Sequence, residues 1–222
     1  MSTTTSDLKE SHHSSPWWEI LLVMGISLSI SLLFPSFAIV GILIPIAYLI
    51  IDHHVRHRTW SESGFHFKML PQDLRHNWGW VLLVSVGLQT LSVFGAYFFL
   101  PEYSSHVISR LPFDVHTFDS SLLSTLFFVT LGEEIIYRAL FQKRLGDFLP
   151  VWAAILLSSV VFALMHYAPG PALIVFIDLA LIVMDSIVYG IIFARSDNVF
   201  ASWIAHFLAD VAGIIFLLTI IN

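Results

Sequence analysis

The feature that most constrains this chain is a series of long apolar segments with few charged residues inside them. A helix needs about 20 mostly apolar residues to cross the hydrocarbon core of a bilayer. The segments near this length are Trp17–Phe34, Ser36–Ile51, Trp78–Leu100, Ser120–Phe141, Val151–His166, Ala172–Ala194 and Phe200–Ile221. Charged residues make up only 12% of the chain, about half of their share in a soluble domain. The sequence therefore predicts an all-α, polytopic membrane protein with about seven transmembrane helices, within a range of six to eight.

The composition excludes several kinds of site and partner. The chain contains no cysteine, which rules out disulfides, thiolate metal sites and a cysteine nucleophile. Its formal net charge of −6 argues against a nucleic-acid partner, because phosphate binding requires a basic surface. Membrane lipid is the expected surrounding of the apolar segments.

A polar stretch at residues 1–15 precedes the first apolar segment. It mixes acidic residues with a single lysine and so lacks the basic region of a signal peptide. We expect 1–15 to be a disordered cytoplasmic leader and 16–222 to form a single transmembrane domain, of which the half at 120–221 bears the motifs described below. The first two apolar segments, separated by Pro35, fit either a tight pair of spans or a re-entrant hairpin.

The lysines and arginines predict the orientation of the chain. Of the ten, Arg138 lies inside a predicted span and Arg110 lies alone on one side. The remaining eight share the other side: Lys9, Arg56, Arg58, Lys68, Arg75, Lys143, Arg144 and Arg195. Because cytoplasmic loops carry an excess of lysine and arginine, the N-terminus is predicted to be cytoplasmic and the C-terminus to lie outside.

The segment Thr59–Asn77 between the second and third predicted spans is too polar to cross the membrane. It fits either a short piece lying at the cytoplasmic interface or a solvated loop. Just before it, His53, His54 and His57 have a spacing that could bind a metal, but a solvated interfacial face is the favoured interpretation.

Ionisable side chains inside the predicted spans are candidates for function, because each costs at least ~2.5–3.5 kcal/mol on insertion scales. Glu134 and Arg138 stand four residues apart, the favourable arrangement for a helical ion pair. Glu133 projects about 100° away and has no local basic partner, so we expect it to be available as a general base. The alternative is that both acids lie near the cytoplasmic end and extend to water.

Three later spans add further ionisable residues. His166 ends the fifth span, and His206 and Asp210 share a face of the seventh. Imidazole and carboxylate groups are zinc ligands, although a lone membrane histidine is more often a hydrogen-bonding strut between helices. Asp178 and Asp185 share a face of the sixth span and fit a common cavity, a cation site or, as the favoured interpretation, a wet crevice.

These residues fall into three motifs. In chain order the motifs are Glu133-Glu134-x-x-x-Arg138, Phe162-x-x-x-His166 and His206-x-x-x-Asp210. Together they resemble the CPBP family, which comprises the CAAX-type prenyl endopeptidases together with bacterial Abi and bacteriocin-immunity proteins. Each motif alone is weak, whereas all three in this order in a polytopic chain are a specific signal.

The resemblance implies an intramembrane protease. Glu133 would be the base that activates a water molecule, and His166 would be its partner. His206 and Asp210 would stabilise the oxyanion or complete a metal site. The structural support of the site would come from Glu134, Arg138 and Phe162.

The resemblance leaves two interpretations of the cofactor. One divalent metal, zinc, would draw its ligands from Glu133, His166, His206 and Asp210, and the alternative is that no metal is needed. Asp210 replaces the asparagine of the prenyl endopeptidases, and an ionised aspartate cannot donate to an oxyanion. It therefore favours a protonated acid, a metal ligand or a hydrogen bond that orients His206, and it tilts the interpretation slightly towards a metal.

The leading functional hypothesis is an endopeptidase of a bacterial inner (plasma) membrane that acts on a membrane-associated peptide or protein tail. The alternative is a non-catalytic protein of the same fold, such as an immunity factor or a partner-binding scaffold. A transporter is disfavoured because no inverted repeat is evident. The sequence is also compatible with partner proteins that bind the chain within the membrane. The small residues Ala201, Ala205, Ala209 and Gly213 permit close helix approach, which we expect to occur within the chain.

The predicted spans carry one internal conflict. They place His166 near the outer end of its helix and His206 near the inner end of another. The two histidines would then differ in depth by ~15 Å, although a shared site requires similar depths.

Overall fold

The computed structural model describes residues 16–111 and 118–221, and the leader predicted at 1–15 lies outside the described residues. Regular structure in these ranges is entirely helical, which confirms the all-α prediction. The α-helices are α2 (Trp17–Leu33), α3 (Ala38–Val55), α4 (Leu70–Leu82), α5 (Ala96–Phe99), α6 (Tyr103–Arg110), α7 (Ser120–Glu134), α8 (Lys143–Leu145), α9 (Val151–Met165), α10 (Ala172–Ser196) and α11 (Val199–Ile221). The π-helical segments η4 (Leu83–Leu88) and η5 (Leu91–Gly95) extend α4, and η6 (Ile135–Gln142) joins α7 to α8. The short 3-10 turns are η1 (Pro35–Phe37), η2 (Ser61–Ser63) and η3 (Phe67–Met69).

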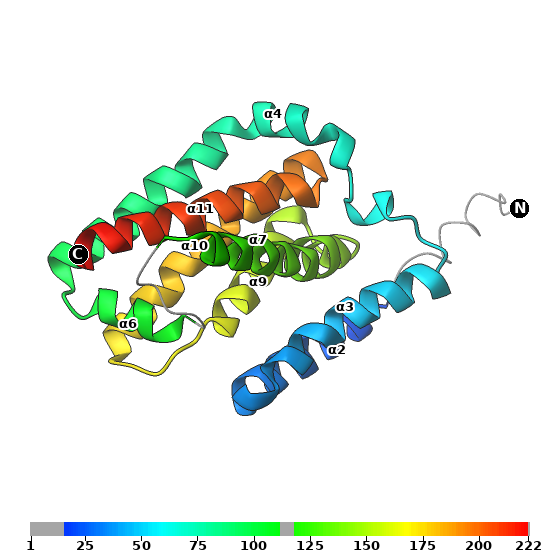
Figure 1. Cartoon of the computed structure of the whole chain (residues 1–222). Helices are drawn as coiled ribbons and strands as arrows, with labels where there is room; N and C mark the ends of the chain where they lie inside the picture. Colours follow the sequence, from blue (N-terminus) through cyan, green and yellow to red (C-terminus); the bar gives the residue numbers. More distant parts are fainter. Residues whose placement is uncertain (1–15, 112–117, 222) are drawn as a thin grey trace, which may run out of the picture.

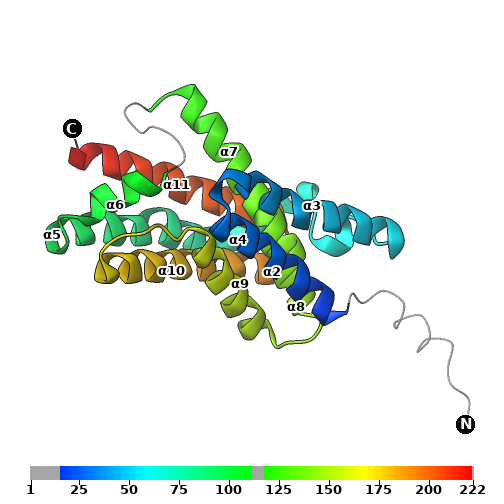
Figure 2. The same cartoon turned by 90° about the horizontal axis from the view of Figure 1, so that it is seen from below.

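The later helices form the body of the molecule (Figure 1). Helix α10 packs along both α9 and α11, and α11 also contacts α7 and η4. Helices α2 and α3 pair with each other and attach to one side of the body through α9 and η6. The view from below shows α2 crossing the helices of the body (Figure 2). The motif-bearing helices α9 and α11, together with the segment η6 that continues α7, therefore meet α10 in the middle of the bundle.

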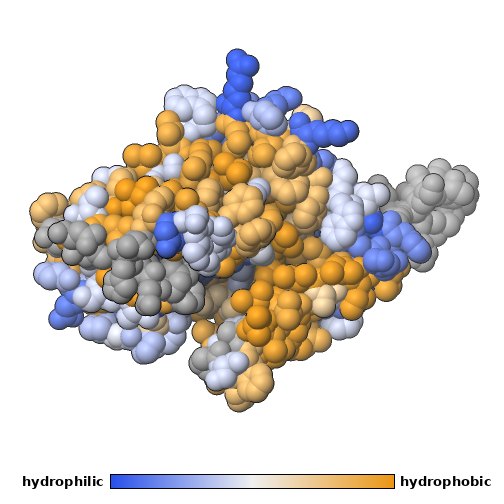
Figure 3. All heavy atoms as spheres, in the orientation of Figure 1, coloured by the Kyte–Doolittle hydropathy of each residue, from blue (hydrophilic) through white to orange (hydrophobic). Residues whose placement is uncertain are grey.

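The apolar surface agrees with an integral membrane protein. In the described part of the chain, three helices are long and apolar enough to cross a membrane: Phe67–Gly95, Ala172–Ser196 and Val199–Ile220. Three shorter apolar helices accompany them: Trp17–Leu33, Ile39–Val55 and Val151–Met165. Hydrophobic residues cover much of the face seen in Figure 3. The predicted count of seven spans stays a prediction, because the shorter helices do not meet the length needed for a full crossing.

The paired helices α2 and α3 run antiparallel. Ser27 Oγ donates a hydrogen bond of 2.7 Å to the carbonyl oxygen of Gly41, and Tyr48 donates one of 2.8 Å to Glu19. A Cβ atom at Gly41 would lie 2.9 Å from the Ser27 carbonyl oxygen, so glycine permits the close approach. Pro35 begins the short turn between the two helices, where the sequence predicts a break.

The polar segment predicted as an interfacial piece or a solvated loop is largely helical. Helix α4 begins at Leu70, eight residues before the predicted start of the span. Its polar residues have partners, because Asn77 accepts a hydrogen bond of 2.9 Å from Arg195. Asn198 likewise donates one of 2.7 Å to Asp73. Contacts with the ends of neighbouring helices thus stabilise polar turns that hydropathy alone assigns to a loop.

A buried aspartate fastens the end of α3 to α8. Asp52 is fully buried and pairs with Arg144 at 3.1 Å, with Arg58 at 3.3 Å and with Arg56 at 2.5 Å. His53 is buried as well, and its Nε2 atom lies 3.1 Å from Ser63 Oγ. The predicted solvated histidine face is therefore wrong for His53, because the chain after α3 folds back and covers it.

Close helix contacts in the body use small residues. Ala201, Ala205 and Ala209 are completely buried and pack against α10 and η4, as expected for contacts within the chain. A Cβ atom at Gly190 would lie 2.8 Å from Gln142 Oε1 and 3.0 Å from Cγ2 of Ile155. Glycine at 190 therefore sets the spacing between α10, α9 and η6.

Replacing Gly190 by alanine should lower the melting temperature of the detergent-solubilised protein, because overpacking a tight core costs ~1–3 kcal/mol. The matched control is Gly25→Ala in α2, where an added Cβ meets nothing within 4 Å. We expect this control to leave the melting temperature unchanged or slightly raised. Equal shifts in the two variants, measured by differential scanning fluorimetry, would contradict the packing assigned to Gly190.

Candidate active site

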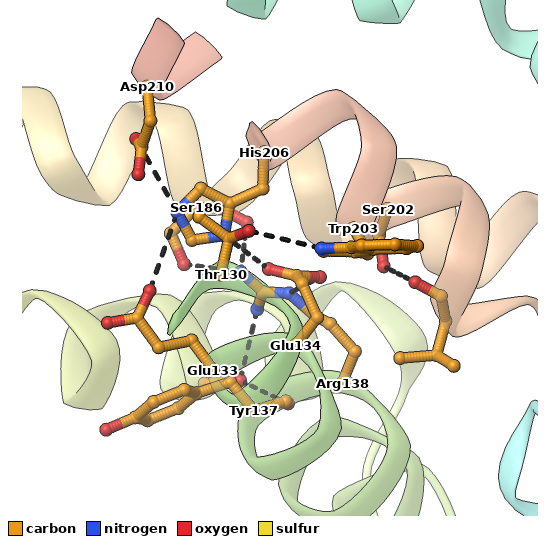
Figure 4. A network of polar contacts seen from close by, with 12 residues as sticks. Thr130, Glu133, Glu134, Tyr137, Arg138, Ser186, Ser202, Trp203, His206 and Asp210 are labelled. Carbon is orange, nitrogen blue, oxygen red and sulfur yellow. Dashed lines mark hydrogen bonds and ion pairs between the residues drawn. The ribbon is translucent and has the colours of Figure 1, made fainter. Parts of the chain in front are cut away.

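The frame of the site is a charged pair buried inside the bundle (Figure 4). Glu134 ends α7 and Arg138 lies on η6, and both side chains are 0% exposed. Arg138 Nε lies 3.4 Å from Glu134 Oε2, as the four-residue spacing predicts. The next residue at this spacing, Gln142, is also buried and lies 3.4 Å from Arg138 Nη1. A ladder of polar side chains therefore runs along one face of this helix.

Arg138 holds three helices together through its guanidinium group. It donates hydrogen bonds of 3.2 Å to Ser158 Oγ on α9 and of 2.8 Å to Ser186 Oγ on α10. It also donates one of 3.0 Å to the Ser186 carbonyl oxygen. The rings of Phe162 and Tyr189 lie 5.8 and 6.0 Å from its central carbon, within the range of cation–π attraction. The charge of the guanidinium is therefore compensated by the Glu134 carboxylate, by hydrogen bonds from its terminal amino groups and by aromatic faces, although Nε makes no hydrogen bond to the described residues.

The second role of Glu134 is to orient His206. Glu134 Oε1 lies 3.0 Å from His206 Nδ1. The ring of His206 stacks on Tyr189, with centroids 4.4 Å apart and an interplanar angle of 19°. When Nδ1 carries the proton that Glu134 accepts, the opposite nitrogen, Nε2, faces the centre of the site.

Glu133 lies between the two histidines of the other motifs. Its Oε1 atom is 3.7 Å from His166 Nε2 and its Oε2 atom is 3.6 Å from His206 Nε2. The side chains of Glu133 and His166 are each 25% exposed, whereas that of His206 is 4% exposed. Unlike Glu134, Glu133 has no arginine partner within 4 Å among the described residues. Of the two adjacent glutamates, Glu133 is therefore the one whose carboxylate is not held by an arginine and can exchange its contacts during a reaction.

The hydrogen bonds of His166 determine which of its nitrogens faces Glu133 as an acceptor. His166 Nδ1 lies 2.9 Å from the carbonyl oxygen of Phe162, so in the neutral ring Nδ1 carries the proton. Nε2 then carries a lone pair and faces a carboxylate oxygen. Two acceptors 3.7 Å apart do not hydrogen-bond directly, whereas a molecule that donates to both can bridge them.

Asp210 completes the group of predicted site residues. Its Oδ1 atom lies 3.7 Å from His206 Nε2, and its side chain is 37% exposed. Phe162 is buried between the two histidines, with ring centroids 4.6 Å from His166 and 5.6 Å from His206. The structure therefore brings together all seven residues predicted for the site.

The predicted depth difference between the histidines is wrong, because both reach the carboxylate of Glu133. Helix α9 has 15 residues and is about 22 Å long, which is shorter than the hydrocarbon core. Its end at His166 lies at the level of Glu133 and His206.

The two aspartates of α10 have different surroundings. Asp178 is 1% exposed and lies 3.1 Å from Arg110 Nε, so the predicted wet crevice is wrong for this residue. Asp185 is partly exposed and accepts a hydrogen bond of 2.9 Å from Gln89 on the helical extension of α4. The spacing along the helix predicts that Asp178 and Asp185 share a face of α10. It does not predict their neighbours, because Arg110 and Gln89 lie on two other helical segments.

Sequence reasoning missed several polar partners of the frame. They are Gln142, Ser158, Ser186, Tyr189 and Gln89. Gln142 continues the four-residue spacing of Glu134 and Arg138, so this spacing could have found it. The others carry no comparable signal, because each becomes a partner only through contact between helices.

The donor groups of the site suit zinc chemically, since they are imidazole nitrogens and carboxylate oxygens. Within residues 16–111 and 118–221, however, no three histidine, aspartate or glutamate side chains are grouped closely enough to hold a metal ion. The Nδ1 atoms of His206 and His166 bond to Glu134 and to the Phe162 carbonyl. Metal-ligating imidazoles make such bonds too, so the spacing of the donor groups decides the fit. The described geometry therefore does not fit a preformed metal centre.

Comparison with known families agrees with this site. Residues 118–212 match the family model described as Type II CAAX prenyl endopeptidase Rce1-like. The match contains all three motifs and confirms the predicted resemblance to the CPBP family. Searches of curated proteins and of solved structures give no match. Residues 118–212 are thus similar to the type II CAAX prenyl endopeptidases, and the apolar helices agree with an integral membrane protein.

Replacing Arg138 by methionine should lower the melting temperature strongly, because it leaves the Glu134 carboxylate buried without its cation. Breaking one side of a buried ion pair costs ~3–5 kcal/mol. The double variant Glu134→Gln/Arg138→Met should melt above the single Arg138→Met variant, since neither buried charge is then left alone. A double variant that is less stable than the single one, measured in detergent, would contradict the assigned pairing.

Proposed function

We propose that the chain is an intramembrane endopeptidase that hydrolyses a peptide bond in a membrane-associated protein or peptide. The observation that supports this proposal is the position of the Glu133 carboxylate between the Nε2 atoms of His166 and His206, at 3.7 and 3.6 Å. The family match supports the reaction class. Glu133, His166, His206 and Asp210 carry the chemistry, with Glu134, Arg138 and Phe162 as their support.

The first step is activation of a water molecule by Glu133 and His166. The Glu133 carboxylate and the His166 Nε2 lone pair are both acceptors, so a water that donates to both is held between them. Glu133 takes one proton as the water oxygen attacks the carbonyl carbon of the substrate. The C–O bond forms as the carbonyl π electrons move to its oxygen, which gives a tetrahedral oxyanion.

The second step is stabilisation and collapse of this intermediate. His206, held by Glu134 through Nδ1 at 3.0 Å, donates from a protonated Nε2 to the oxyanion. Asp210, at 3.7 Å from the same nitrogen, keeps the ring aligned and balances its charge. The oxyanion electrons re-form the carbonyl, the C–N bond breaks, and Glu133 returns its proton to the leaving amine.

The surroundings of the site suit a substrate that lies in or at the membrane. Membrane lipid contacts the apolar helices, and a peptide or protein tail reaches the partly exposed Glu133. We propose a bacterial inner membrane as the location of the chain. The N-terminus is proposed to lie in the cytoplasm, because lysines and arginines gather on that side. The partly exposed, arginine-free Glu133 favours catalysis over a non-catalytic binding role, because a binder gains nothing from this exposed acid–base group.

Replacing Glu133 by glutamine should lower the hydrolysis rate by ~10²–10⁴-fold, because it removes the general base. The test is cleavage of a lipidated peptide by the purified protein in nanodiscs, measured by mass spectrometry. The melting temperature should change little, since Glu133 makes no contact shorter than 3.6 Å with its histidine neighbours. The matched control is Glu102→Gln, at an exposed glutamate just before α6. Full activity of Glu133→Gln would overturn the proposed mechanism.

Metal content tests the cofactor separately. Because the described ligands do not form a preformed metal site, we expect activity to survive EDTA and the purified protein to contain far less than one zinc per chain. Mass spectrometry of the wild type beside His206→Ala provides the measurement. Close to one zinc per chain, lost in His206→Ala, would contradict this expectation and establish the metal form of the proposal with Asp210 as a ligand.

A further inference from the structure

The buried carboxylate of Asp178 holds the side chain of Arg110 beside the site. Asp178 on α10 is 1% exposed and pairs with Arg110 Nε at 3.1 Å. Tyr103 donates a hydrogen bond of 3.2 Å to the same carboxylate, and His106 Nε2 lies 3.5 Å from it. All three partners belong to the short helix α6. This helix is therefore attached to α10 through the buried Asp178 carboxylate, in addition to the apolar contact of Tyr103 with Ile174.

Helix α6 also contacts the loop that follows His166. A Cβ atom at Gly170 would lie 2.9 Å from Nδ1 of His106, so the loop passes directly over the histidine ring. Gly170 stands four residues after His166 in the chain. The two attachments of α6, to Asp178 and to this loop, place Arg110 at the border of the site between α9 and α10.

The charge of Arg110 reaches the reacting groups. It interacts electrostatically with Glu133, His166 and Asp210, and with Asp185 on the adjacent face of α10. Between Arg75 and Arg138 the sequence contains no other lysine or arginine. Besides the buried Arg138, Arg110 is thus the basic residue of this part of the chain whose charge acts on the acidic groups of the site.

Within residues 16–111 and 118–221, the guanidinium of Arg110 has N–H donors that no other side chain uses. Among the described residues Asp178 is its ion-pair partner, through Nε, and the side chain is 18% exposed. A guanidinium has five N–H donors in a planar fork, so the terminal amino groups can receive a second carboxylate. A carboxylate on a bound peptide would be repelled by Glu133, Asp185 and Asp210 and attracted by Arg110.

We propose that Arg110, held by Asp178, binds a carboxylate group of the substrate peptide and thereby selects the bond presented to Glu133. The proposal rests on the proposed endopeptidase function and adds a specificity-determining residue to it. The carboxylate belongs either to the C-terminus of the peptide or to an acidic side chain. Both sources offer Arg110 the same charge-assisted hydrogen bonds.

The test is a competition for binding to the immobilised, detergent-solubilised Glu133→Gln protein, which retains peptides without cleaving them. The probe is a pool of N-palmitoylated octapeptides that vary in their last four residues. The pool contains free-acid peptides without acidic side chains, their C-terminal amides, and amides that carry one glutamate. Mass spectrometry of the retained peptides gives the ratio of each carboxylate-bearing set to the plain amides.

At least one carboxylate-bearing set should be retained about 10-fold or more over the plain amides. Enrichment of the free acids identifies the C-terminus as the source, and enrichment of the glutamate-bearing amides identifies a side chain. Adding Arg110→Gln should bring the ratio close to one, and Arg110→Lys should retain part of it. Arg75→Gln, at an exposed arginine on α4, is the matched control and should leave the ratio unchanged.

The ratio separates binding from folding, because a damaged fold lowers the retention of all three sets together. The variant Asp178→Asn/Arg110→Gln removes both members of the buried pair and should also give a ratio near one. Equal retention of the three sets by the Glu133→Gln protein, or no retention at all, would overturn the proposal. Hydrolysis by the wild type is scored independently. Arg110-dependent retention without any hydrolysis would overturn only the endopeptidase function. Equal hydrolysis of peptides with and without a carboxylate would overturn only the role of Arg110.

Discussion

The structure depends on the buried ion pair between Glu134 and Arg138. A charge inside an apolar bundle is tolerated only with a partner and with its remaining hydrogen-bonding groups satisfied. Besides pairing with each other, Arg138 bonds to α9 and α10 through Ser158 and Ser186, and Glu134 contacts α11 through His206. Satisfying the two charges therefore fixes the relative positions of the helices that carry the three motifs.

This arrangement separates two adjacent glutamates into different roles. Glu134 is completely buried and its oxygens face Arg138 and His206, whereas Glu133 is partly exposed and faces two imidazoles at 3.6–3.7 Å. One helix thus supplies both the support of the site and its reactive carboxylate. The rigid support matters for chemistry, since a general base acts well only when its geometry relative to the substrate is held.

The same principle recurs at the edges of the bundle. Buried Asp52 attaches the end of α3 to Arg144 on α8, and buried Asp178 attaches α6 to α10 through Arg110. In each case one carboxylate in an apolar setting recruits basic residues from a distant segment. These contacts explain why His53 is buried and Asp178 is dry, although their local sequence suggests interfacial or wet positions.

The sequence by itself determined the all-α class, the positions of the main helices and the seven residues that meet at the site. Apolar length indicates the helices, because it is a property of each helix alone. The three motifs indicate the seven residues through their resemblance to the CPBP family. Only the tertiary structure decided that His166 and His206 lie at the same depth, and that Ser158, Ser186 and Gln89 are partners. Such contacts join residues on different helices, and no pattern along one helix records where its neighbour ends or which of its faces it meets.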